Sequence, residues 1–405
     1  MTLATAPLVV MLVGVVAYAV LGGADFGAGF WQMIPGRDEQ RRAVRSHARH
    51  AITPVWEANH VWLIFVLVIC WTCYPGVYGS IASTLALPLA IAGLGIVLRA
   101  IGYVVRGQAR GGRIERPVEI LFGVASVIVP FALGAVVGAI ASGRVPPGNA
   151  RGDLVTSWVN PTSVAVGVLA VVSAAYLAAV WLAADARRQG DAEVESAFRA
   201  LAIGTAAVAG VVALAGLITV DYDDERLWHN LVRWPAVAAV ALSAAAGLVA
   251  IGCLATRRLE SARIVSTAAV AAVIAGWGLA QRPEMLPGVT VTEAAAGRET
   301  LIAVLAGLAV GALILVPSLF VLFRMVLRGR FDPAAALQPA ALPAYSPVLE
   351  PGRLVFLCAV GAVAGGLMLF FFSSGWTIAI GVSLMLVFGA LGFGVAARSL
   401  VAAEG

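Results

Sequence analysis

Two short motifs place acidic side chains in or beside apolar segments, where an ionised carboxylate is costly unless it has a partner or a function. The first is LGGADFGAGF, residues 21–30, in which Asp25 follows an uncharged stretch from Pro7 to Val20. In a helix over residues 7–33, Asp25 lies eight residues before the C-terminal end, which is about 12 Å at about 1.5 Å per residue. A carboxylate at this depth indicates an ionisable group that transfers protons or ions.

Four glycines flank Asp25, on two faces of the expected helix. Gly22 and Gly29 share the face of Asp25 at i−3 and i+4, which leaves room for another helix or for ordered water. Gly23 and Gly27 form a G-x-x-x-G motif on a different face, a pattern typical of close helix packing.

The second motif is VWEANHVW, residues 55–62. At helical spacing Glu57 and His60 share one face, while Trp56 and Asn59 share another. Glu57 lies about 5 Å into this helix. Asp25 and Glu57 then form a staggered pair of acids that opens at one membrane face, as a proton entry path requires.

The same residues also have simpler explanations. An acid in the first turn of a helix is favoured by the helix dipole, which applies to Glu57. Trp56 and Trp62 suit an aromatic belt at the membrane interface. His60 is a less favoured haem ligand, and His47, in an arginine-rich loop, is expected to be solvated. The histidines are too few and too dispersed for a metal site.

The composition excludes a soluble fold of this size, because the chain is 61% hydrophobic and only 12% charged. The sequence predicts an all-α polytopic membrane protein of about eleven transmembrane helices, each near the ~20 residues that a bilayer requires. The expected spans are 7–33, 54–73, 78–104, 118–141, 162–184, 199–220, 231–254, 264–281, 300–327, 353–373 and 376–398.

Charge predicts the topology. All basic residues are arginines, and most of the 27 lie in short loops after odd-numbered spans, which excludes a nucleic-acid-binding role. By the positive-inside rule the N-terminus is external and the C-terminus cytoplasmic. The four cysteines lie in apolar spans, so neither a disulfide framework nor a metal site is expected. Pro88, Pro130 and Pro317 are expected to kink their spans.

The two motifs resemble those of subunit II of the cytochrome bd-type quinol oxidases. That family carries a glycine-flanked aspartate in its first helix and a W-D/E-x-N-x-V-W block at the start of its second, matched here by residues 56–62. LRAIGYVVRG, residues 98–107, with Arg99 and Arg106 in register, and GWGLAQRPEMLP, residues 276–287, extend the likeness. It covers residues 1 to about 330.

The resemblance implies a function and a domain plan. Such a subunit pairs with a haem-bearing subunit I, which holds haems of b and d type, in a bacterial plasma-membrane complex that oxidises quinol and reduces dioxygen to water. Subunit II supplies a proton pathway, here Asp25 and Glu57, holds no catalytic haem or metal, is not expected to act alone, and can bind a structural quinone. Residues 1–328 form the family domain, 329–352 a proline-rich cytoplasmic linker, and 353–405 an added hairpin.

Two departures from the family affect these expectations. Val104 stands where the family often has an aspartate before Arg106, which puts that part of the proton route in doubt. The added hairpin is expected either to replace a small single-helix accessory subunit or to cover a lipid-facing or haem-facing surface. An ion-coupled secondary transporter is the alternative function, although its acids and broken helices would lie near the midplane. A third possible function is that of a purely structural subunit, whose acids serve only folding.

Overall fold

The computed structural model describes residues 2–33, 39–51, 56–108 and 115–327, together with scattered positions between 361 and 391. The chain divides into two units, Met1–Leu315 and Val316–Gly405, and every interaction described below lies in the first. The predicted linker 329–352 and most of the predicted hairpin 353–398 lie outside the described residues.

The first span is one continuous helix with an irregular turn in its middle. It comprises α1 (Ala6–Ala17), the π-helical turn η1 (Tyr18–Gly22) and α2 (Gly23–Trp31). Asp25 lies in the first turn of α2. π-Helical turns inside α-helices occur frequently at functional sites.

A short helix, α3 (Glu39–Ala51), replaces the arginine-rich loop expected between the first two spans. Its apolar side is buried through Val44 and Ala48, in the same cluster as residues of α8 (Pro161–Gln189) and α9 (Ala192–Asp223). His47 was predicted to be solvated. It is instead partly buried, with Nε2 3.3 Å from the carbonyl oxygen of Leu182 and its ring centroid 5.9 Å from that of Phe198.

The predicted third span is broken rather than kinked. After α4 (Trp56–Cys73), α5 (Pro75–Thr84) and α6 (Ala86–Gln108) meet at Leu85 with a bend of 82°. Pro88 explains the position of the break, because it has no N–H to donate to the carbonyl of Thr84 one turn earlier. By contrast, α7 (Glu115–Ala141) and α14 (Arg298–Leu327) continue through Pro130 and Pro317.

The remaining elements complete an all-helical bundle with one small hairpin. They are α10 (Glu225–Leu231), α11 (Ala236–Ala255), α12 (Leu259–Gln281), β1 (Glu284–Leu286), β2 (Val289–Thr290) and α13 (Val291–Ala294). The strands are antiparallel, with Glu284 opposite Thr290, and Gly288 takes the positive φ of +73° that their turn needs. The pKa of Glu293 lies below its usual range because its carboxylate accepts hydrogen bonds from Thr290. The bond from the backbone N–H of Thr290 has the larger effect, and the bond from its hydroxyl the smaller.

Within the described residues, seven helices are long and apolar enough to cross a membrane. The bent pair α5–α6 counts as one more if it is a single span, and Asn59–Cys73 of α4 is apolar but shorter. Each span predicted between residues 7 and 327 overlaps one of these helices, so the all-α polytopic class is confirmed. The total of eleven stays a prediction.

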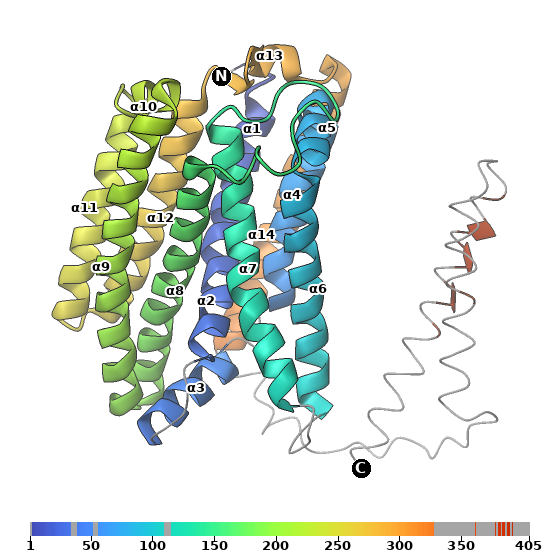
Figure 1. Cartoon of the computed structure of the whole chain (residues 1–405). Coiled ribbons are helices and arrows are strands. Elements are labelled where there is room, and N and C mark those ends of the chain that lie inside the picture. Colours follow the sequence, from blue (N-terminus) through green and yellow to red (C-terminus); the bar gives the residue numbers. More distant parts are fainter. Residues whose placement is uncertain are drawn as a thin grey trace. The chain divides into compact units, whose positions relative to one another are not determined.

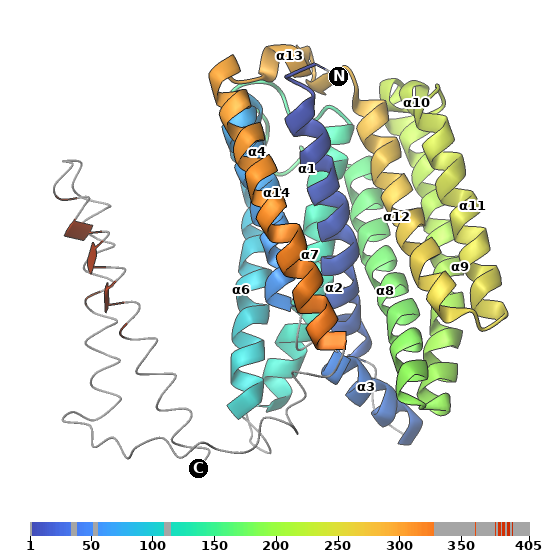
Figure 2. The same cartoon turned by 180° about the vertical axis from the view of Figure 1, so that it is seen from behind.

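The helices α3 and α10 lie at opposite ends of the bundle, and α13 lies at the same end as α10 (Figures 1 and 2). The arginine-rich α3 is held to α7 because Arg45 and Arg49 both pair with Glu119. The basic segment after the first span is therefore fixed at one end of the bundle.

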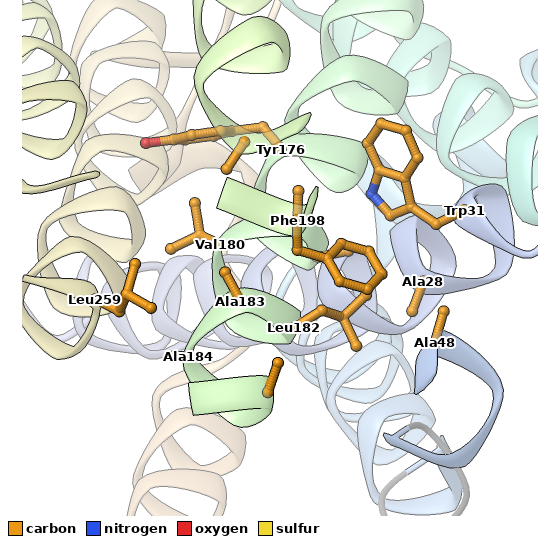
Figure 3. Packing of buried hydrophobic residues seen from close by; sticks show 14 of the residues in the cluster. Ala28, Trp31, Ala48, Tyr176, Val180, Leu182, Ala183, Ala184, Phe198 and Leu259 are labelled. Carbon is orange, nitrogen blue, oxygen red and sulfur yellow. The ribbon is translucent and has the colours of Figure 1, made fainter. Parts of the chain in front are cut away.

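The helix α8 is the centre of the packing, in contact with α2, α7, α9 and α12. Figure 3 shows part of its core, in which Leu182 and Phe198 lie with Ala28 and Ala48. Trp31 adds a polar contact, as its indole N–H donates to the carbonyl of Ala175 at 2.9 Å. On α2 a Cβ added at Gly27 would overlap the carbonyl oxygen of Ala174.

Gly27→Ala should therefore destabilise the bundle. The added methyl meets backbone atoms that cannot rotate away, and overpacking of this kind costs about 1–3 kcal/mol. We expect a lower Tm for the purified protein in detergent. Gly247→Ala on α11 is the control, because nothing lies within 4 Å of a Cβ at that position. Equal Tm values for the two variants would contradict the α2–α8 packing.

Candidate buried charge site

A buried ion pair joins the first and third predicted spans. Nη2 of Arg99, on α6, lies 2.7 Å from Oδ1 of Asp25, on α2. The side chains are 1% and 3% exposed. The same guanidinium nitrogen lies 3.4 Å from the carbonyl oxygen of Asp25. The carboxylate that the sequence singled out thus has an arginine partner inside the bundle.

The rest of the guanidinium group is enclosed by α7 and by α2. Nη1 donates to the hydroxyl of Ser126, which in turn donates to the carbonyl of Phe122 at 2.7 Å. The Arg99 Cζ atom lies 4.2 Å from the centre of the Phe122 ring and 4.7 Å from that of Phe26. Aromatic faces attract a cation, and more strongly where water is excluded. The arginine is therefore bound on several sides.

Glycine at position 29 makes this arrangement possible. A Cβ there would overlap the Ser126 hydroxyl and would lie 2.7 Å from Nη1 of Arg99. At Gly22, one turn before Asp25, a Cβ would lie 3.1 Å from the ring of Tyr18. These two glycines leave room for polar and aromatic side chains, whereas Gly23 and Gly27 both face Ala174 of α8.

The second motif meets the first span at the π-helical turn. Nδ2 of Asn59, on α4, donates to the carbonyl oxygen of Leu21 at 3.2 Å. A π-helical turn disrupts the regular i→i−4 pattern, so an external donor at this carbonyl stabilises the irregular backbone. Asn59 is 4% exposed and fixes α4 against the turn that precedes Asp25.

His60 lies in an aromatic cluster beside the ion pair. Its ring centroid is 6.1 Å from those of both Tyr18 and Phe26. Phe26 also packs against Arg99, so residues from both motifs surround one site. Trp62 lies further along α4 and packs edge-on against Phe65 at 6.0 Å.

Three predicted site residues have side chains outside the described part of the structure. Glu57 and Trp56 lie in the first turn of α4, and Arg106 lies near the end of α6, but only their backbone is described. Among the described residues, no group of three or more His, Cys, Asp or Glu side chains is arranged to hold a metal ion.

Sequence reasoning missed several residues of this site. It placed Arg99 only by resemblance and did not pair it with Asp25. It assigned no role to Ser126 or Phe122, and their spacing of four residues was the available signal, since they share one face of α7. It also missed the π-helical turn, which no local propensity marks.

Comparison with known proteins assigns the family. Residues 3–326 match the family model of the cytochrome bd terminal oxidase subunit II. The chain belongs to this family. Its fold is also similar to the structure of bd oxidase from Geobacillus thermodenitrificans, with a TM-score of 0.67 and 25% sequence identity. That match covers 81% of this chain and 99% of the other.

Curated relatives of this bd oxidase subunit match shorter segments of the chain. Cytochrome bd ubiquinol oxidase subunit 2 of Bacillus subtilis (strain 168) is 29% identical over 29% of this chain. Cytochrome bd-I ubiquinol oxidase subunit 2 of Escherichia coli (strain K12) is 25% identical over 33% of it. The matched segments span between 34% and 62% of the length of the curated relatives.

The ion pair predicts a non-additive response to substitution. Asp25→Asn leaves Arg99 as an uncompensated buried charge, which costs about 3–5 kcal/mol. Arg99→Gln likewise leaves the carboxyl group of Asp25 buried without its arginine partner. We expect the double variant Asp25→Asn/Arg99→Gln to regain part of the Tm that either single variant loses, measured on the purified protein. Losses that simply add would contradict the pairing.

Proposed function

We propose that this chain is the subunit without catalytic haem of a membrane quinol:dioxygen oxidoreductase. The observation that carries the proposal is the family match over residues 3–326, and the likeness to a bd oxidase structure supports it. A partner subunit I with haems of b and d type would oxidise quinol and reduce dioxygen to water. The chain described here would stabilise that subunit and deliver protons, and would not be active alone.

The proton route starts at Glu57 in this proposal. Glu57 lies in the first turn of α4. This end of α4 follows the arginine-rich α3 in the sequence, so it lies on the same side of the membrane as α3. The positive-inside rule assigns this side to the cytoplasm, with the N-terminus external. A carboxyl at that depth can take a proton from cytoplasmic water and pass it inward.

Asp25 has a different part in this route. Its carboxyl group lies 2.7 Å from the guanidinium group of Arg99, inside the bundle. We therefore assign Asp25 to the route as a supporting residue, which holds Arg99 in place while the acid Glu57 takes up the proton.

The family assignment favours the oxidase over the ion-coupled transporter. The broken pair α5–α6 resembles the discontinuous helices of transporters. Its break, however, adjoins α5 near the end of the bundle at which α13 lies, away from α3 (Figure 1). A structural quinone remains part of the proposal, together with either a small single-helix accessory subunit or, in its place, the hairpin at 353–398.

Substitution of Glu57 tests the relay directly. In the complex purified with its partner subunit, Glu57→Gln should lower quinol-driven oxygen uptake by at least about tenfold, because loss of a proton-transferring group typically costs this much or more. The haem spectra should be unchanged. Glu260→Gln is the matched control, since Glu260 is an exposed acid paired with Arg188. Full uptake by Glu57→Gln in a haem-replete complex would refute the relay.

A further inference from the structure

Two buried polar atoms beside the π-helical turn have no hydrogen-bond partner in the described part of the chain. They are the hydroxyl oxygen of Tyr18 and Oδ1 of Asn59. Leaving such an atom unsatisfied costs about 1–3 kcal/mol. Native proteins usually satisfy buried polar atoms of this kind with ordered water.

Both atoms belong to the same junction between the first span and α4. Tyr18 begins the turn η1, and its ring lies over Gly22 of that turn. Asn59 reaches the turn from α4 through its other amide atom, which bonds to the carbonyl of Leu21. The two side chains therefore contact neighbouring residues of η1, Gly22 and Leu21.

The walls of this junction are aromatic and adjoin the buried charges. The His60 ring packs against both Tyr18 and Phe26, and Phe26 lies against Arg99. The Tyr18 ring also lies edge-on to that of Phe26, with the ring centroids 6.5 Å apart. A polar group between apolar walls and a fixed ion pair is a suitable environment for a few ordered water molecules.

We infer that water binds at the junction of η1, α2 and α4, bridging the Tyr18 hydroxyl and Oδ1 of Asn59, and that this water carries protons inward from Glu57. The inference deepens the proposed function and rests on it. Water donates to Oδ1 of Asn59, and the Tyr18 hydroxyl donates to or accepts from water. One proton enters the water for each one that leaves, so the phenol stays neutral.

The order of the residues along the helices agrees with an inward route. Asn59 and His60 follow Glu57 by less than one turn of α4. Tyr18 precedes Asp25 by seven residues, which places it about 10 Å further from the α3 end of the first span. Stepwise proton transfer requires groups at successive depths in the membrane, and these residues lie at successive depths.

A density map of the complex tests the site without any activity measurement. At a resolution that shows ordered water, we expect at least one water molecule within hydrogen-bond distance of both the Tyr18 hydroxyl and Oδ1 of Asn59. A well-defined junction without water, or with the two atoms bonded directly to each other, would overturn the inference.

Tyr18→Phe tests whether this water carries protons. The variant keeps the ring and removes only the hydroxyl, so haem content should be unchanged. Oxygen uptake should fall by at least about tenfold, with a larger solvent deuterium isotope effect. Tyr176→Phe is the control, because Tyr176 on α8 also carries a buried hydroxyl but lies in a separate, apolar cluster.

The outcomes separate this inference from the proposed function. Normal uptake in Tyr18→Phe, with reduced uptake in Glu57→Gln, would overturn the water relay and leave the oxidase role intact. Normal uptake in both would refute the proton route altogether. If Tyr18→Phe does not assemble, the density map decides the question alone.

Discussion

The buried contact between Asp25 and Arg99 constrains the rest of the bundle. Neither charge is tolerable alone in an apolar interior, so α2 and α6 must meet where the two side chains meet. Ser126 and Phe122 bring α7 to the same point, because they enclose the other side of the guanidinium. Three helices, α2, α6 and α7, are thus fixed by one pair of charges, and replacement of either charge affects all three.

The first span can satisfy this constraint only because its faces are specialised. Gly29 opens one face to Arg99 and Ser126, while Gly27 lets the other face approach the backbone of α8. Between α1 and α2 the π-helical turn changes the register of the helix, and Asn59 holds the Leu21 carbonyl in that turn. The two motifs therefore act together. The first supplies the carboxylate of Asp25, and the second, through Asn59, stabilises the turn that orients Asp25 towards Arg99.

The sequence predicted the fold class, because runs of apolar residues near bilayer length determine helices almost without regard to context. It also identified Asp25, since a lone carboxylate in an apolar run is conspicuous. It could not predict the partner of Asp25, which depends on how helices separated by 74 residues pack. Likewise α3 was read as a loop, because its arginines dominate its composition. Its apolar face becomes evident only when Val44 and Ala48 are seen against α8 and α9.

The central claim is that the carboxyl group of Asp25 is bound to Arg99 while protons pass through Glu57. Infrared difference spectra of the complex, recorded between its oxidised and reduced states, test this most directly, because a protonated carboxyl has its own C=O stretching band. The account predicts a carboxyl band that disappears in Glu57→Gln and persists in Asp25→Asn/Arg99→Gln. A band that disappears only when Asp25 is replaced would contradict it.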